Sequence, residues 1–216
     1  MRNHLLLATV TAAMLVLALP ASAAKPPLQV AVRTDGVSVS GVTPGGDVVL
    51  FWYTKTSRGG VMHSDAHAML LHDEDRRGVV SLQAPVPLRS VWVAVDAGDG
   101  TAGYGALPQF PLVTAAIDQA IFRKDAEGEI ASMVQEIPRL AVLLVRPANG
   151  AWMVRGRDGD LNDRDGAANG TLEIAFEDTV SIVDAKKKGP KHLKAGDVIA
   201  AIDPGHLTIF IGQVTK

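Results

Sequence analysis

The sequence predicts an all-β fold built from two β-sandwich halves that are joined by a short helical or irregular connector. Two observations predict it. Short runs rich in valine alternate with more polar residues, and turn residues separate these runs about every 8 to 12 positions, which is the pattern of a β-sandwich. The expected boundaries are residues 1–23 for a signal peptide, 24–111 for the first half, 112–137 for the connector and 138–216 for the second half.

The first half contains six expected strands. Leu28, Val30 and Val32 alternate with more polar neighbours up to Asp35-Gly36, a dipeptide that favours a type I′ turn and therefore a hairpin. Thr43-Pro44-Gly45-Gly46 then breaks the chain. The expected strands are 28–32, 37–42, 48–55, 66–72, 79–84 and 91–96.

The second half repeats this pattern. Expected strands at 140–146 and 151–155 flank Pro147-Ala148-Asn149-Gly150, which predicts a hairpin connection, and further strands are expected at 171–176, 180–183, 198–203 and 207–214. The run from Val91 to Gly98 aligns with the run from Val198 to Gly205. Two interpretations stay open, an internal duplication and two unrelated strands of the same type.

The connector allows two structures. Val113, Ile117, Ala120 and Ile121 fit a helical period, as do apolar residues at 130, 133, 134 and 137. The same residues fit a hairpin around Asp125-Ala126-Glu127-Gly128. We favour a mostly β chain with at most a short helix in this segment.

The first 24 residues have the pattern of a secretory signal peptide. Arg2 gives a short positive region, 5–19 are apolar, and Ala21-Ser22-Ala23 supplies the small residues that a signal peptidase needs. The alternative is an uncleaved N-terminal anchor. We expect a secreted protein, periplasmic or extracellular, whose mature chain begins near Ala24.

Composition narrows the class of partner. The 21 Lys and Arg stand against 23 Asp and Glu, and without Arg2 the net charge is −3, so we expect no nucleic-acid partner. The chain has no cysteine, so neither disulfides nor an N-terminal lipid on cysteine is expected. No later segment approaches the roughly 18 apolar residues of a transmembrane helix.

The loop from Asp158 to Gly166 is the first candidate site. Asp158, Asp160 and Asn162, together with Asp163 or Asp165, could converge on a calcium ion, since hard cations prefer oxygen ligands. An EF-hand does not fit, because Asp163 replaces its glycine and Asn169 replaces its bidentate glutamate. The alternative is a solvated turn capped by these short polar side chains.

Histidines form the second candidate. His63 and His67 share a face on either a helix or a strand, and with Asp65 they could hold zinc for a metal-dependent hydrolase. The HExxH glutamate is absent, and His72 would point away from His67 on one strand. Surface histidines without a metal are the favoured interpretation.

A basic loop is the third candidate. It contains Lys186, Lys187, Lys188, Lys191, His192 and Lys194 around Gly189-Pro190, and it could contact anionic envelope polymers or phospholipid head groups. The alternative is an ordinary solvated loop. No serine lies in a GxSxG turn and no glycine-rich phosphate motif has a strand–loop–helix context.

The segments SGVTPGGDVVLFW and RSVWVAVDAGDG resemble the immunoglobulin-like modules of exported bacterial proteins. With DGDLNDRDGAANGTLEI and LKAGDVIAAIDP, the chain is similar to a loose group of bacterial secreted proteins. The resemblance implies two immunoglobulin-like halves and transfers no functional residue. Every convergent polar group lies in an expected turn, and no set of acid, base and nucleophile can be assembled from the motifs. The expected function is therefore a non-catalytic binding or structural module of the bacterial cell envelope, with a metal-dependent hydrolase using His63, His67 and Asp65 as the alternative.

Overall fold

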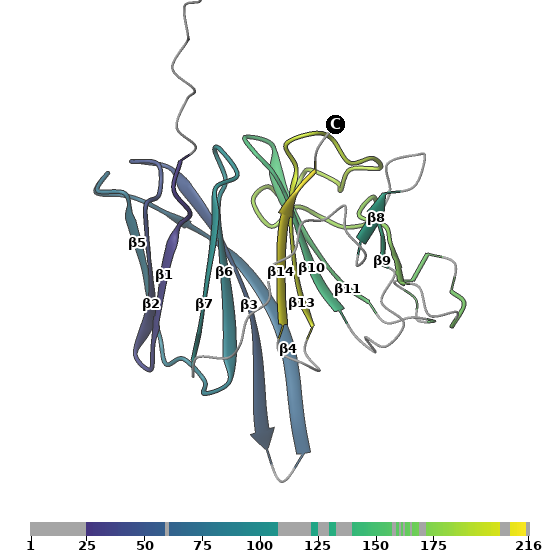
Figure 1. Cartoon of the computed structure of the whole chain (residues 1–216), viewed down its shortest axis with the longest axis horizontal. Helices are drawn as coiled ribbons and strands as arrows, with labels where there is room; N and C mark the ends of the chain where they lie inside the picture. The colour runs from purple at the N-terminus through teal and green to yellow at the C-terminus, as the bar shows by residue number, and fades with distance from the viewer. Residues whose placement is uncertain are drawn as a thin grey trace, which may run out of the picture.

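The described part of this computed structural model is all β (Figure 1). It comprises residues 25–58, 61–107, 122–124, 130–132, 140–156, 159, 161, 163–164, 166–168, 172–203 and 208–214, with the side chains of 55–64, 122–124, 130–132 and 208 left out. Across these residues the chain forms fourteen strands and no helix. Consequently, no helix in these ranges is long and apolar enough to cross a membrane.

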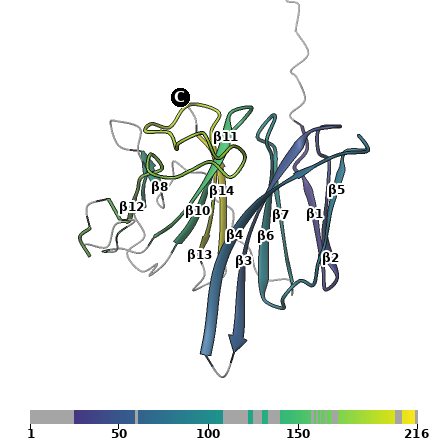
Figure 2. The same cartoon turned by 180° about the vertical axis from the view of Figure 1, so that it is seen from behind.

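The first half consists of two sheets packed face to face. The order of one is β1 (Gln29–Arg33), β2 (Gly36–Ser40), β5 (Val79–Gln83), and the order of the other is β4 (Val61–His72), β3 (Asp47–Arg58), β6 (Ser90–Asp96), β7 (Ala102–Leu107). Both views show β3 and β4 extending beyond the other strands of their sheet (Figures 1 and 2). The core between the sheets contains Leu28, Val37, Val39, Val42, Val48, Leu50, Val80, Val86, Trp92 and Ala94.

The second half also has a four-stranded and a three-stranded sheet. The order of the larger is β11 (Gly150–Gly156), β10 (Leu140–Arg146), β13 (Val198–Asp203), β14 (Thr208–Gln213), and the order of the smaller is β12 (Leu172–Ile174), β9 (Ile130–Ser132), β8 (Phe122–Lys124). Their core contains Leu140, Val142, Leu144, Trp152, Val154, Leu172, Ile174, Phe176, Ile199, Ala201, Phe210 and Val214.

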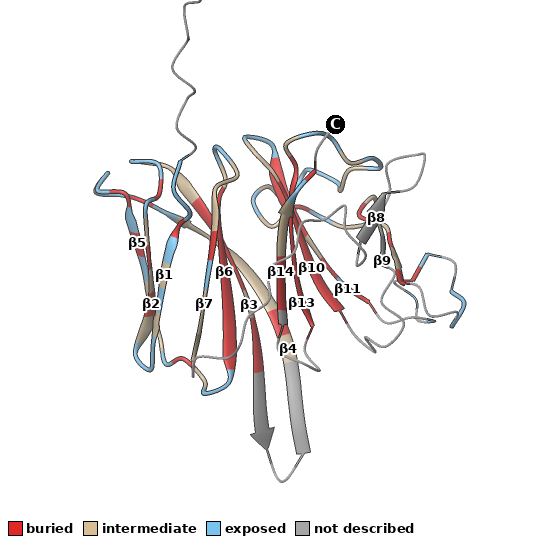
Figure 3. Ribbon diagram, viewed as in Figure 1, coloured by how far each residue is buried: buried red, intermediate tan, exposed pale blue. Residues whose placement is uncertain are grey.

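The two four-stranded sheets pack against each other, so the halves share a third core. Val49, Phe51 and Tyr53 on β3 meet Leu143 and Ile202 of the second half in one buried cluster. As a result, β6, β10 and β13 are buried along almost their whole length (Figure 3). The alternation along β6 therefore separates two buried faces, with Val91, Val93 and Val95 towards the second half and Trp92 and Ala94 towards β2.

Strand pairing follows the same plan in both halves. β1-β2-β5 corresponds to β8-β9-β12, and β4-β3-β6-β7 corresponds to β11-β10-β13-β14, with every pair antiparallel. In this correspondence β6 matches β13. These are the two strands whose sequences align.

The structure answers the question left open for 112–137 in its described parts. Phe122–Lys124 and Ile130–Ser132 pair as a hairpin, which is the alternative built around Asp125 to Gly128. The expectation of a helical or irregular connector is therefore wrong for these residues, because β9 also pairs with β12 and so belongs to a sheet of the second half. The rest of the segment lies outside the described residues.

Two local predictions are wrong. The first turn occupies Thr34-Asp35, and Gly36 starts β2 without a left-handed φ. Glycine is needed there for space instead, since a Cβ would lie 2.5 Å from the Leu82 carbonyl oxygen. Residues 180–183 form an isolated β-bridge at Val180 followed by a bend rather than a strand. Ser181 caps that bend by accepting hydrogen bonds from the backbone N–H groups of Val183 and Asp184.

Candidate functional site

The basic loop lies at the end of the second half where β10 turns into β11 (Figure 2). Its backbone is fixed by hydrogen bonds: Ser181 N–H donates to the Lys187 carbonyl oxygen at 2.9 Å, and Gly189 N–H donates to the Thr179 carbonyl oxygen at 2.9 Å. Val180 and Lys188 also form an isolated β-bridge. The lysines therefore project from an ordered backbone.

Glycine 189 permits this path. A Cβ at Gly189 would collide with the carbonyl oxygen of Phe176. The loop thus passes directly against the segment after β12, with Lys188 and Pro190 on either side of the contact. Any larger residue would displace the lysines from their position.

A pocket of about 270 Å³ lies beneath the loop. It combines side chains from β10, the β10–β11 turn and β11 with side chains from the basic loop, which lie 35 or more positions further along the sequence. The lining residues are Arg146, Asn149, Trp152, Lys187, Lys188 and Pro190.

Arg146 forms one wall of this pocket and is itself held in place. Its Nε and Nη2 donate to the two carboxylate oxygens of Asp197 at 2.8 Å each, and Nη2 also donates to the His192 carbonyl oxygen at 2.8 Å. Asp197 is buried, so this bidentate pair is strong and fixed in orientation. The charge of Arg146 is thereby balanced, and the pair anchors the second part of the loop.

Lys187 and Lys188 supply positive charge that is not balanced in this way. Lys187 Nζ donates to the Asn149 carbonyl oxygen at 2.8 Å, which leaves its charge uncompensated. Within the described residues, no ion pair joins Lys186, Lys187 or Lys188 to a carboxylate. All three lysines are exposed. The mouth of the pocket is therefore positive although the whole chain is slightly acidic.

Trp152 lines the same pocket and carries a buried hydrogen-bond donor. Its side chain is 3% exposed, and its indole Nε1 is buried without a hydrogen-bond partner in the described part of the chain. A buried donor without an acceptor costs about 1–3 kcal/mol. By contrast, the indole N–H of Trp92 donates to Ser90 Oγ at 2.9 Å.

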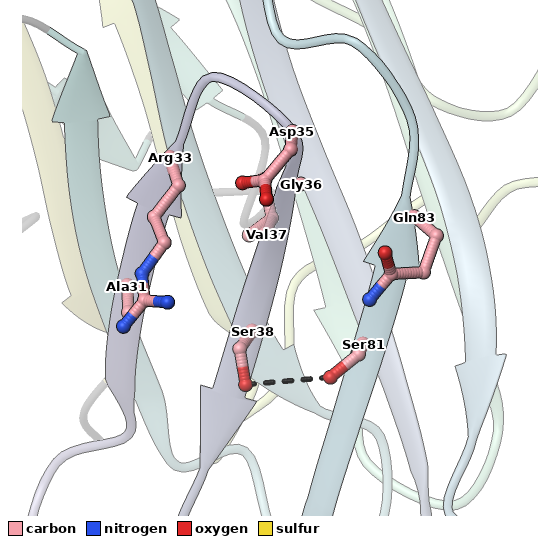
Figure 4. A pocket seen from close by; sticks show the side chains of 8 residues that line it. All are labelled: Ala31, Arg33, Asp35, Gly36, Val37, Ser38, Ser81 and Gln83. Carbon is pink, nitrogen blue, oxygen red and sulfur yellow. Dashed lines mark hydrogen bonds between the residues drawn. The ribbon is translucent and has the colours of Figure 1, made fainter.

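A second hollow of about 270 Å³ crosses the outer face of β1, β2 and β5 (Figure 4). Register places small residues along its floor, with Ser38 opposite both Ala31 and Ser81. Arg33, Asp35 and Gln83 line one end, and Ser81 Oγ donates to Ser38 Oγ at 3.4 Å. This groove is polar but lacks a buried unpartnered group.

The histidine candidate is only partly described. Asp65 and His67 lie on one face of β4, with 3.6 Å between Oδ2 and Nε2, whereas the side chain of His63 lies outside the described residues. The His67 ring stacks on Trp52, which stacks on Trp92, at centroid distances of 5.3 and 4.7 Å. Arg155 Nη1 donates to Asp65 Oδ1. His67 therefore packs against Trp52, and Asp65 pairs with Arg155.

The acidic loop is described only at Asp163 among its five predicted calcium ligands. Asp158, Asp160, Asn162 and Asp165 lie outside the described residues. The Asp163 carboxylate is 4% exposed and accepts hydrogen bonds from the Gly159 N–H at 2.7 Å and the Glu173 N–H at 3.0 Å. Asp163 therefore closes the loop onto β12.

Buried carboxylates also hold loops of the first half. Burial would raise the pKa of Asp96, but the Thr43 N–H and hydroxyl, the Gly98 N–H and Lys25 donate to it and lower its pKa below 3.8. Asp73 is similar, since the Gly45 and Gly78 N–H groups outweigh burial and lower its pKa. Both carboxylates order turns rather than face a pocket.

The sequence pointed to the lysines that line the pocket but not to Arg146 and Trp152, which line it from β10 and β11. Arg146 and Trp152 lie on expected strands, and nothing in their immediate sequence distinguishes them from core and edge residues. Within the described ranges, no group of three or more His, Cys, Asp or Glu side chains is placed to hold a metal ion. No protein-family model matches the chain, and no curated protein matches it either.

Proposed function

We propose that this protein is an exported, non-catalytic binding module of the bacterial cell envelope. The observation that carries the proposal is the ordered basic loop over the pocket at Trp152. Exposed lysines on a flexible loop serve solubility, whereas lysines fixed over a pocket present charge in a defined arrangement. Anionic polymers and lipid head groups are abundant in cell envelopes and have the complementary charge.

The architecture that supports this role is a pair of immunoglobulin-like sandwiches that arose by duplication. Lettering the strands of either half A, B, C, C′, E, F and G gives sheets A-B-E and C′-C-F-G, the order of that fold. Trp52 on strand C stacks on Trp92 of strand F, at the place where antibody domains pack a tryptophan against their disulfide. Such sandwiches present binding loops at their ends.

The signal-peptide pattern of residues 1–23 supports export. Lys25 follows the expected cleavage site by two residues, and its Nζ forms ion pairs with Asp96 and Asp99, so the fold uses the chain from this point on. We expect the exported protein to lack residues 1–23. Mass spectrometry of protein recovered outside the cytoplasm measures this, and a mass that includes the leader would contradict cleavage.

Binding is tested by cosedimentation. The exported form is incubated with isolated envelope, separately with the peptidoglycan and with the membrane fraction, at physiological salt. We expect the protein in the pellet of at least one fraction, in a saturable manner. Recovery in the supernatant with every fraction would overturn the proposed function.

A further inference from the structure

We propose that the pocket formed by Trp152, Lys187 and Lys188 binds a phosphate group. This inference rests on the proposed function, because it names the ligand chemistry of that binding module. The inference goes beyond the proposed function because it assigns a binding site, the donors of that site and the group that they bind.

Charge is the first argument. The ammonium groups of Lys187 and Lys188 belong to adjacent residues of one pinned segment, and Lys186 precedes them. Since Asp197 already neutralises Arg146, the lysines give the pocket its net positive charge. Lysine binds phosphate as a point charge and needs no planar geometry.

The indole of Trp152 is the second and independent argument. It lines the pocket, and its Nε1 is buried without an acceptor in the described part of the chain. An anion in the pocket would accept from this N–H. Because Nε1 is covered, the surrounding side chains must shift slightly to admit the anion, and the exposed Lys187 side chain would exchange its hydrogen bond to the Asn149 carbonyl oxygen for one to the anion.

Size favours phosphate over a larger ligand. A volume of about 270 Å³ accommodates one phosphate and a short part of the molecule that carries it. Pockets for drug-sized ligands begin at about 300 Å³. A tetrahedral phosphate also presents oxygens in several directions at once, which suits an indole N–H and two ammonium groups arriving from different segments.

The test follows the indole N–H directly by NMR. In ¹⁵N-labelled exported protein, the three tryptophans give three indole signals, and the signal of Trp152 is the one lost in Trp152→Phe. Titration with inorganic phosphate at constant ionic strength should move that signal in a saturable manner. The chemical shift of the Trp92 indole should not change, because its N–H already donates to Ser90 Oγ.

Matched lysine variants separate the pocket from the general charge of the loop. Lys187→Ala/Lys188→Ala should weaken phosphate binding at least tenfold. Lys191→Ala/Lys194→Ala removes the same charge from the same loop, but neither residue lines the pocket. This control should change the affinity for phosphate less than threefold. Unchanged circular dichroism and melting temperature show that each variant is folded.

Three results would overturn the inference: an unmoved Trp152 signal, an equal shift with chloride, or equal weakening in both lysine pairs. Glycerol 3-phosphate and phosphatidylglycerol vesicles then identify the source of the phosphate. Saturable binding of the soluble ester alone assigns a polymer phosphate, and vesicle binding assigns a lipid head group. Phosphate binding without envelope cosedimentation would retain this site and reject the proposed function.

Discussion

Lys25 Nζ lies 3.0 Å from Asp96 Oδ2, and this ion pair fastens the segment before β1 to the end of β6. The Asp96 side chain is fully buried and also accepts two hydrogen bonds from Thr43 and one from the Gly98 N–H. Burial would lower the pKa of Lys25, but its hydrogen bonds to Asp99 and Asp96 raise it. One carboxylate thus organises three separate segments.

We expect Asp96→Ala to lower the free energy of unfolding by about 3 kcal/mol, because it leaves buried donors without an acceptor. Asp99→Ala is the matched control, since Asp99 also pairs with Lys25 but its side chain is 40% exposed. It should cost under about 1 kcal/mol. Urea unfolding measures both, and equal effects would contradict the role given to Asp96.

Acid should destabilise the protein through these carboxylates. Burial would raise the pKa of Asp96 and of Asp73, but the hydrogen bonds that they accept outweigh burial and lower both pKa values. Both carboxylates therefore stay ionised in the folded state at a pH where the unfolded chain takes up protons. Their contribution to the free energy of unfolding is therefore present above pH 3.8, and it is lost as the pH falls through their lowered pKa values in the folded state. Urea unfolding near neutrality and at several values below 3.8 measures the loss. Asp96→Ala should show a shallower decline, and a parallel decline would contradict this.

The sequence was sufficient for most strands and insufficient for how the sheets stack. Alternating valines predicted β2 and β6, because side chains on a strand alternate between its faces. β7 was missed, since its AGYGAL sequence has little β-propensity. The basic loop was predicted, but the pocket beside it was not. Consecutive lysines are visible in the sequence, but the contact of Trp152 with them depends on long-range packing.

Gly103 explains the unusual sequence of β7. A Cβ at Gly103 would collide with the Leu28 carbonyl oxygen, in a place where the Leu28 N–H donates to the Ala102 carbonyl oxygen at 3.1 Å. Gly103→Ala should therefore push β1 from β7 and destabilise the protein by about 1–3 kcal/mol. Thermal unfolding measures it. Tyr104→Phe, at the exposed neighbour, is the control and should change little. Equal melting temperatures for Gly103→Ala and wild type would show that the close approach is not needed.

Phe51 tests whether the two halves unfold together. It is fully buried in the core between the four-stranded sheets, so Phe51→Ala should cost about 3–5 kcal/mol. Because Leu143 and Ile202 of the second half share that core, the loss should appear in both halves. Hydrogen exchange measures protection strand by strand. We expect faster exchange in β10 and β13 as well as in β3 and β6, and a change confined to the first half would mean that the halves are independent.

We expect the acidic loop to bind calcium. Asp158, Asp160, Asp163 and Asp165 place four carboxylates within eight residues, and Arg157 and Arg164 are the nearby cations in the sequence. A divalent ion would relieve their repulsion, and at 100 times its dissociation constant it would stabilise the fold by about 2.7 kcal/mol. Melting temperatures with calcium and with chelator measure this, and Asp158→Ala/Asp160→Ala should abolish the difference.

Asp163→Ala is the informative comparison for this loop. Its carboxylate already accepts from two backbone N–H groups, so this variant should lower the melting temperature with and without calcium. A wild-type melting temperature that calcium leaves unchanged, or a shift that persists in Asp158→Ala/Asp160→Ala, would reduce the loop to a turn that Asp163 closes by hydrogen bonds alone.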